Sequence, residues 1–287
     1  MKHIVLCDMS SIVKALAFSK ENAEIASDLK MLREMVLNHL QRIHTKMKTM
    51  AKGQPELVLV YDMPKVWRKE VFPNYKWKDP DTIKETGINM ENFYVNFNII
   101  KHEYSNALPL VTVSVENAEA DDVIAVVTRY ETDRGSNVSI VSNDEDFLQL
   151  RPLNVVQYKA TKLTPVTADY DLFEHVCRGD RADGIPNILS DVDCFKNKVR
   201  QTTLRNTSVE KWRDNYTSPE MFCDNSAMYD RFITNRKLID FKYIPQDIVS
   251  KVESVYMQSI ANKPTGKVRE YCNEHSLTTF LYSGGFQ

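Results

Sequence analysis

The sequence predicts an α/β fold with a central, mostly parallel sheet, helices on both of its faces, and a smaller C-terminal helical region. Short apolar runs rich in β-branched residues alternate with longer segments of helical periodicity, a pattern typical of α/β proteins. The apolar runs are continuous, as expected for strands that are buried on both faces of a parallel sheet. This strand signal ends near residue 185, and the chain beyond it is more polar.

Four apolar runs are the candidate strands of the sheet. They lie, in chain order, at 3–7 (HIVLC), 57–61 (LVLVY), 110–115 (LVTVSV) and 138–142 (VSIVS). Each run is followed, directly or within a few residues, by one or more acidic side chains. Because ligands of open α/β sheets bind beyond the carboxyl ends of the strands, these acids mark the expected functional edge of the sheet.

Helical spacing of apolar residues predicts two long helices between the strands. They cover 27–52 and 119–133 and end at Gly53 and Gly135. Weaker patterns indicate helices at 227–240 and 246–260. We therefore expect an α/β domain at 1–185, which includes a long connecting segment at about 63–105, and a helical region at 186–287.

Composition excludes several classes of protein. The hydrophobic content of 43% and the charged content of 26% are ordinary for a globular protein with a sizeable core. No apolar run approaches the roughly 18 residues of a membrane span, and the N-terminus lacks the features of a signal peptide, so we expect a cytoplasmic protein. Five scattered cysteines and six histidines without metal-site spacing indicate neither a disulfide framework nor a zinc site.

The acids that follow the strands indicate a metal centre. An acid after a single strand is commonly a helix N-cap, but four strand ends carry acids that a parallel sheet brings to one edge. Such clustering is tolerable when cations neutralise it, and all-oxygen ligands select Mg²⁺, with Mn²⁺ as a substitute. The nine candidate ligands are Asp8, Asp62, Glu119, Asp121, Asp122, Asp144, Asp146, Asp180 and Asp183.

Nine acids exceed what one cation requires. They indicate two neighbouring sites, or one site with a supporting layer of acids. Paired cations are a known solution for in-line cleavage of phosphodiesters, in which one activates water and the other stabilises the leaving oxygen. The acid cluster therefore favours a metal-dependent nuclease.

Two basic stretches are candidate nucleic-acid contacts. Residues 65–78 (KVWRKEVFPNYKWK) interleave basic and aromatic side chains, the combination that holds single strands, although a solvated surface segment reads similarly. Residues 196–213 are basic and could follow a duplex backbone, or form an ordinary charged face. The residues expected to bind nucleic acid are Arg68, Lys69, Tyr75, Lys76, Lys78, Lys196, Lys198 and Arg200.

The blocks ENAEADDVIA (116–125), SNDEDFLQL (142–150) and GDRADGIPNI (179–188), together with Asp8 and Asp62, resemble the 5′→3′ exonuclease and flap-endonuclease family. Their order and spacing are most similar to its ribonuclease H branch from T-even-type phages. The similarity extends to YDRFITNRKLIDFKYIPQDI (229–248) and so covers nearly the whole chain.

The resemblance implies a 5′-nuclease (PIN-like) fold and a two-metal phosphodiesterase that removes RNA primers and adjacent DNA from 5′ ends during phage DNA replication. The acids matching Asp8, Asp62, Glu119, Asp121 and Asp144 surround the first Mg²⁺ in that family, and those matching Asp146, Asp180 and Asp183 lie toward the second. Asp122 matches an acid that supports the ligands from outside. The implied catalytic set is Asp8, Asp62, Asp121, Asp144 and Lys76.

The segment at about 63–105 then corresponds to the helical arch of the family, through which a 5′ single strand passes. Arg68 and the Tyr75–Lys76 pair match arch residues that approach the scissile phosphate and its neighbouring base. The implied substrates are RNA–DNA hybrids and flapped or nicked duplex DNA. A monomer in the infected bacterial host is expected, and a phage single-strand-binding protein or a sliding clamp is left open as a partner.

Two departures from the family pattern stand out. Relatives often read Y-K-x-N-R in the arch, whereas this chain reads YKWKD at 75–79, so that Asp79 replaces the arginine and Lys78 is the candidate substitute. The glycine-rich helix–three-turn–helix is also missing, because no G-x-G turn follows Asn187. The resemblance therefore does not extend to the motif with which relatives grip downstream duplex.

Three other functions are compatible with parts of the sequence to different degrees. A catalytically silent protein that binds branched DNA, and an RNA endonuclease of the PIN type, are the two alternatives that stay open. An aspartyl phosphatase would carry an acid two residues after Asp8, where this chain has Ser10. Neither a P-loop nor a dinucleotide-binding glycine motif is present.

Overall fold

The computed structural model describes residues 2–18, 25–51, 54–77, 89–214, 218–265, 267–277, 280 and 286. They form two compact units whose segments interleave along the chain. The sheet unit comprises 1–63, 87–167 and 247–287, and the helical unit comprises 64–86 and 168–246. This division differs from the expected boundary at residue 185, because the C-terminal residues Tyr271, Cys272 and Leu277 are buried in the core of the sheet unit.

A five-stranded parallel sheet is the centre of the sheet unit, and it confirms the predicted fold class. Its strands are β1 (His3–Asp8), β2 (Glu56–Val60), β3 (Val111–Val113), β4 (Asn137–Val141) and β5 (Val156–Tyr158). Their order is β3-β2-β1-β4-β5, and each pairing is parallel. The four predicted strands are β1 to β4, whereas the three-residue β5 was not predicted. The order reverses its direction between β1 and β4, where the carboxyl ends of the strands open a site for ligands.

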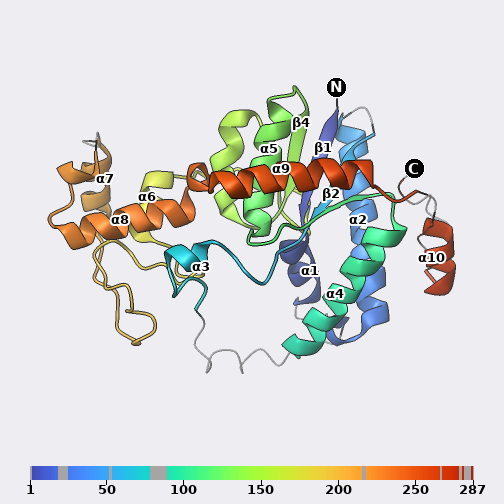
Figure 1. Ribbon diagram of the computed structural model, residues 1–287, viewed down its shortest axis with the longest axis horizontal. Helices are drawn as coiled ribbons and strands as arrows, with labels where there is room; N and C mark the ends of the chain where they lie inside the picture. The colour runs from blue at the N-terminus through green and yellow to red at the C-terminus, as the bar shows by residue number, and fades with distance from the viewer. Residues whose placement is uncertain are drawn as a thin grey trace. The chain divides into compact units, whose positions relative to one another are not determined.

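Helices cover both faces of this sheet (Figure 1). Those of the sheet unit are α1 (Met9–Ala17), α2 (Leu29–Ala51), α4 (Met90–Ala107), α5 (Ala120–Thr132), α9 (Gln246–Ala261, from Asp247 onward) and α10 (Val268–Glu274), with 3₁₀ helices η1 (Ile25–Ser27) and η3 (Glu145–Leu153). Val5 and Cys7 pack in one core with residues of α1, α2 and α4. Their neighbours Ile4 and Leu6 point to the opposite face, where α5 lies against β1, β2 and β4.

Helix α9 packs beside α5. The hydroxyl of Tyr256 in α9 donates to Glu131 Oε1 of α5 at 2.7 Å, and its ring meets the ring of Tyr130 edge-on at 5.8 Å.

Two predicted helices of the sheet unit, at 27–52 and 119–133, are α2 and α5. The fully buried stripe of α2 has helical spacing and consists of Leu32, Val36, Leu37, Leu40, Ile43 and Met47.

The helical unit has its own apolar core. Its helices are α3 (Arg68–Val71), α6 (Leu172–Arg178), α7 (Asn206–Asp214) and α8 (Ser226–Ile239), with 3₁₀ helices η4 (Pro219–Met221) and η5 (Phe241–Tyr243). Phe72, Val176 and Phe232 belong to one buried cluster, which ties the segment after residue 64 to α6 and α8. The buried Asn235 side chain donates to the carbonyls of Val176 at 3.1 Å and Pro186 at 2.8 Å.

The expected arch segment at about 63–105 is divided between the units. Residues up to 77 pack in the helical unit, and α4 packs in the sheet unit. Residues 78–88, which include Lys78 and Asp79, lie outside the described residues. Within the described part of the chain, no helix has the length and apolar character needed to cross a membrane.

An ion pair joins α2 to α4 and to the C-terminal region. Arg33 contacts both carboxylate oxygens of Glu103 at 2.7 Å, and Tyr271 donates to Glu103 Oε2 at 2.9 Å. Arg33 is 6% exposed, so its charge depends on Glu103 for compensation. Burial would raise the pKa of Glu103, but the hydrogen bonds from Arg33 and Tyr271 and the charge of the Arg33 guanidinium lower it overall.

We predict that Arg33→Met lowers the free energy of unfolding by about 3 kcal/mol, because it leaves the Glu103 carboxylate without its cation. Chemical denaturation measures the loss. Lys30→Met, an exposed change on the same helix, is the control and should alter stability by less than about 0.5 kcal/mol. A loss no greater than that of the control would contradict a stabilising role for the pair.

Candidate active site

Asp8 is the last residue of β1 and the N-cap of α1, which places its carboxylate at the carboxyl edge of the sheet. One oxygen accepts a hydrogen bond from the Ser11 backbone N–H at 3.0 Å, and the other accepts from the Ser142 hydroxyl at 2.7 Å. The side chain is buried, with the residue only 5% exposed. β1 therefore ends in a carboxylate that is held from two sides.

Asp62 follows β2 by two residues and lies at the N-terminus of α5. Its Oδ1 accepts from the backbone N–H of Ala120 at 2.9 Å, and its Oδ2 accepts from the Ser10 hydroxyl at 2.5 Å. An anion at this position is favoured by the helix dipole of α5. Asp62 thus connects the end of β2 with the first turns of α1 and α5.

The carboxylates of Asp8 and Asp62 interact with each other. Burial, with a smaller contribution from the charge on Asp62, raises the pKa of Asp8 to about 6. The hydrogen bonds from Ser142 and Ser11 lower this pKa, but their effect is smaller than the two rises together. The ionised form of Asp8 is therefore costly in the folded protein. A cation shared by the two carboxylates would remove that cost.

The acids of block 116–125 lie at the start of α5. Glu119 is the N-cap residue, and its backbone N–H donates to Asp122 Oδ2 at 3.0 Å. Asp122 is fully buried and Glu119 is 3% exposed, whereas Asp121 is half-buried. The contact of Asp122 with the helix start gives it a capping role, and its predicted part in metal binding stays a prediction.

Asp144 follows β4 and caps the 3₁₀ helix η3. Its Oδ1 accepts from the Asp146 N–H at 2.9 Å, and its own N–H donates to the Ser142 hydroxyl at 3.1 Å. The same Ser142 hydroxyl donates to Asp8, so it bridges the ends of β1 and β4. The side chain of Gln157 in β5 donates to the carbonyls of Ser142 and Asp144 at 3.1 and 2.5 Å.

Three further residues that hold or face these acids carry no motif in the sequence. Ser142 and Gln157 fix the turn after β4, and Lys101 of α4 lies near Asp62. The Lys101 ammonium group lies over the Tyr61 ring, 5.2 Å from its centroid. Burial lowers the pKa of Lys101, and the charge on Asp62 opposes that shift. The sequence does not predict this contact, because it depends on how α4 packs near the end of β2.

The acids of the sheet unit follow its strands as predicted, and hydrogen bonds connect the ends of β1, β2 and β4. Across the residues that the structure describes, however, no three carboxylate, histidine or cysteine side chains form a group arranged to hold a metal ion. Metal ligation by each acid therefore stays a prediction. The charge on Asp62 acts on Asp8 and contributes to its raised pKa.

Asp180 and Asp183 belong to the helical unit. Asp180 Oδ1 accepts from the Ala182 N–H at 2.7 Å, and its other oxygen lies 3.7 Å from His175 Nε2. Asp183 accepts from the Tyr75 hydroxyl at 2.8 Å and lies 3.7 Å from the Lys76 ammonium group. The structure thus pairs Asp183 with the predicted catalytic Lys76 inside one unit.

The basic, aromatic stretch is more buried than predicted. Arg68 is 3% exposed, lies over the Trp67 ring and donates from Nε to the Leu238 carbonyl at 2.8 Å. Tyr75 is 3% exposed, and Phe72 belongs to the same core. These contacts give Arg68 and Tyr75 packing roles and do not favour direct contact with nucleic acid.

The other predicted nucleic-acid contacts are on the surface where the structure describes them. Lys69, Lys196, Lys198 and Arg200 are exposed, and Lys76 is half-buried. Lys198 and Arg200 line one pocket of the helical unit. Lys78 lies outside the described residues.

Known families match this arrangement. A model of the 5′-3′ exonuclease N-terminal, resolvase-like domain matches residues 4–176, which carry the sheet and the acids of its edge. The chain belongs to the 5′-3′ exonuclease family. A second model, of the C-terminal region of T4 RNase H, matches residues 166–283. The resemblance noted in the sequence is therefore confirmed.

Individual relatives in this family span very different shares of the chain. The ribonuclease H of Enterobacteria phage T4 is 27% identical over 291 residues, which cover 98% of this chain and 94% of that protein. DNA polymerase I of Chloroflexus aurantiacus is 32% identical over 102 residues, which cover 35% of this chain and 10% of that protein.

Solved structures share the fold of the family. The phage T5 D15 protein, co-crystallised with metal ions, is 13% identical, with a TM-score of 0.59 over 90% of this chain and 100% of its own. The T5 5′-exonuclease with bound zinc gives a TM-score of 0.53 at the same identity and coverage. At this identity the likeness concerns the fold.

The raised pKa of Asp8 predicts a pH-dependent stability in the presence of a chelator. A carboxyl whose pKa is higher in the folded protein stabilises the fold below its unfolded pKa, near 4, and loses that contribution as the pH rises through about 6. Asp8→Asn mimics the protonated form. With EDTA at pH 7.5 it should be more stable than the wild type by on the order of 2 kcal/mol, and the difference should vanish near pH 4.

Chemical denaturation at the two pH values measures this difference. Asp133→Asn, at the exposed end of α5, is the matched control and should show no such pH dependence. An equal stability difference between Asp8→Asn and wild type at both pH values would show that Asp8 is ionised without cost.

Proposed function

We propose that this chain is a Mg²⁺-dependent 5′→3′ exonuclease and flap endonuclease with ribonuclease H activity. Its substrates are RNA–DNA hybrids and flapped or nicked duplex DNA, and its role is the removal of RNA primers and adjacent DNA during phage replication. Membership of the 5′-3′ exonuclease family and the 98% coverage by T4 ribonuclease H support this proposal.

The observation that carries the proposal is the interacting pair Asp8 and Asp62 at the carboxyl edge of the parallel sheet. A buried carboxylate whose pKa is raised further by the charge of a neighbouring carboxylate is unfavourable for folding alone. They suit a site that binds a divalent cation together with an anionic substrate.

The donors around Asp8 fit Mg²⁺ or Mn²⁺ in their chemistry, because they are carboxylate and hydroxyl oxygens. Asp8 and Asp62 would hold the first ion, with Glu119, Asp121 and Asp144 as further ligands. Asp146, Asp180 and Asp183 are the candidates for the second. A bound ion of this kind lowers the pKa of coordinated water and neutralises charge on a phosphodiester.

The protein's own groups orient the acids and add positive potential. Ser10, Ser142 and the Ala120 N–H fix the rotamers of Asp8 and Asp62. Lys101 places a cation near Asp62 that can contact a phosphate oxygen. We assign the same contribution to Lys76, which Asp183 holds in the helical unit.

Cleavage of 5′-labelled substrates tests the proposal. An RNA–DNA hybrid and a 5′-flap duplex are each incubated with Mg²⁺ or with EDTA. The expected result is Mg²⁺-dependent release of short 5′ products from both. Internal cleavage of RNA without 5′ products would favour a PIN-type endonuclease, and tight binding without cleavage would favour a silent binder of branched DNA.

Asp62→Asn and Asp144→Asn should each lower the cleavage rate by at least about 1000-fold, because losing an ion ligand removes several kcal/mol of transition-state stabilisation. Binding of the flap duplex should persist in both variants, since the basic surfaces are unchanged. Asp133→Asn is the matched charge-neutralising control and should cleave like the wild type. Near-normal turnover in either site variant would refute the ligand assignment.

Lys101→Met should lower the cleavage rate by roughly 10- to 100-fold while changing the Kd for the flap duplex by less than threefold. Its charge acts at the phosphate beside Asp62, and one donor to a developing anion contributes about this much to a rate. Lys101→Arg should recover part of the activity. Single-turnover kinetics and anisotropy separate the two effects, and a loss confined to Kd would assign Lys101 to substrate binding.

A further inference from the structure

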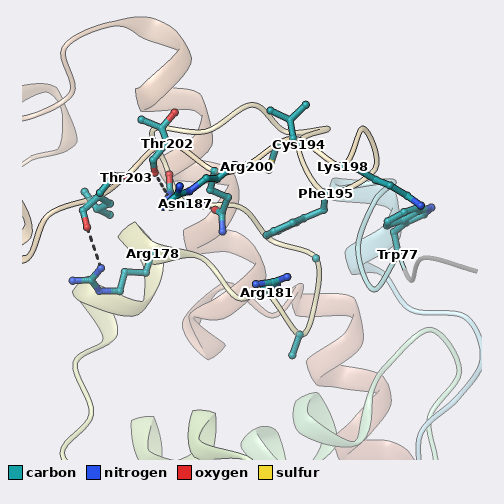
Figure 2. A pocket seen from close by; sticks show the side chains of 15 residues that line it. Trp77, Arg178, Arg181, Asn187, Cys194, Phe195, Lys198, Arg200, Thr202 and Thr203 are labelled. Carbon is teal, nitrogen blue, oxygen red and sulfur yellow. Dashed lines mark hydrogen bonds between the residues drawn. The ribbon is translucent and has the colours of Figure 1, made fainter. Parts of the chain in front are cut away.

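The helical unit contains a pocket of about 930 Å³ that the acid cluster does not use. Three stretches of chain line it, namely Trp77, residues 178–187 and residues 194–204 (Figure 2). Its size falls in the range of pockets that enclose small organic ligands, and it exceeds what a single phosphate group requires.

The lining of this pocket is cationic. Arg178, Arg181, Lys198 and Arg200 belong to it, and the lining residues include no carboxylate. Arg178 is already engaged by Glu174 and Asn206, each at 2.6 Å. Arg181 and Arg200 are exposed, and neither forms an ion pair within the described part of the chain. The pocket therefore attracts an anion to these two guanidinium groups.

Two aromatic rings accompany the arginines. Trp77 and Phe195 are both half-buried, so part of each ring is open to a ligand. Trp77 differs in this from the buried Trp67, Phe72 and Tyr75 of the same stretch. Figure 2 shows Phe195, Arg181 and Arg200 directed into the same space. Cations attract any phosphate, whereas accessible aromatic rings stack on a ligand that has an exposed flat face.

The pocket is held in shape although its loop has little regular structure. The buried Asn187 donates to the Thr202 carbonyl at 2.9 Å, and its backbone N–H donates to Gln201 Oε1 at 2.7 Å. The Thr202 N–H donates to the Ser190 hydroxyl at 2.9 Å. These hydrogen bonds fix the two sides of the loop relative to each other. A loop that is already ordered loses less conformational entropy when a ligand binds.

The position of Trp77 is also fixed. Gly184 has φ +71°, and a Cβ there would lie 3.1 Å from the Asn74 carbonyl oxygen, so a glycine permits the close approach of the two turns. The Asn74 side chain donates to Asp193 at 2.7 Å. Both contacts hold Trp77 beside the loop of residues 194–204.

We propose that this pocket binds one unpaired nucleotide of the substrate, with the base against the Phe195 and Trp77 rings and its phosphate at Arg181 and Arg200. Paired bases are stacked inside a duplex and present no free face, so the rings select a single-stranded nucleotide over duplex. The inference rests on the proposed function, and it names the part of the substrate that the helical unit recognises.

Binding of two labelled duplexes to the full-length chain in EDTA tests the proposal. One duplex carries a single-stranded tail and the other is blunt. Phe195→Leu keeps an apolar side chain but removes the ring, and it should weaken binding of the tailed duplex by roughly tenfold and leave the blunt duplex unchanged. Tyr243→Leu, which removes an exposed ring outside the pocket, is the control and should affect neither.

Equal losses for both duplexes would mean that the pocket grips the duplex backbone, and no loss for either would mean that nucleic acid does not enter it. Both results overturn the proposal. Photo-crosslinking of wild-type protein gives a test without substitution. A 5-iodouracil in the tail should attach to peptides containing Phe195 or Trp77, whereas attachment only from duplex positions would contradict the assignment.

The binding assay needs no cleavage, so the two proposals can fail separately. If the tailed duplex is preferred through Phe195 but no substrate is cleaved in Mg²⁺, the pocket stands and the nuclease proposal fails. If flap cleavage proceeds and Phe195→Leu changes neither tailed binding nor KM, the pocket inference alone is wrong.

Discussion

Parallel pairing of β1 with both β2 and β4 determines where the acids of the sheet unit lie. The register sets Asp8 opposite Val60 and Cys7 opposite Val141, so that Asp62 and Ser142 follow at the same edge. Backbone hydrogen bonds between buried apolar strands thus bring together side chains that would otherwise repel one another. The start of α5 joins this edge because the Ala120 N–H reaches Asp62. A shift of one residue in either pairing would separate the carboxylates.

The same edge shows how folding and chemistry oppose each other. Asp8 is buried with a raised pKa, which favours its neutral form, while a role as a metal ligand requires the ionised form. Serine hydroxyls and helix N-termini hold the two carboxylates in place but do not cancel their repulsion. The stability that this costs comes from the apolar core on both faces of the sheet, where residues such as Ile4 and Leu6 on one face and Val5 and Cys7 on the other are fully buried. The fold tolerates the destabilising carboxylates because the apolar core beneath them is stabilising.

The strands β1 to β4 and the helices α2, α5, α8 and α9 were predictable because each is long or apolar enough to show its periodicity. β5 (VQY) has a polar residue at its centre and gave no apolar run, whereas the equally short β3 lies in one, and α4 is concealed in a connecting segment of mixed character. The strand-end acids were predictable in place, since topology alone puts them at one edge. The burial of Arg68 and Tyr75 was not, because basic and aromatic side chains can face either solvent or a core. The position of Lys101 near Asp62 was not predictable either, because the two residues are 39 positions apart in the sequence.

The interleaving of the two units bears on how the chain is made. Residues 64–77 contribute Val66 and Phe72 to a core that also needs Phe232 and Ile239. On a ribosome this early segment emerges long before its partners, with an interval on the order of 10 s at ordinary elongation rates. Meanwhile β1 to β5 are already complete and can pair. The nascent chain therefore carries an apolar segment whose native partners are incomplete until α6 and then α8 are synthesised, and it is there that chaperone binding or misassembly would occur during translation.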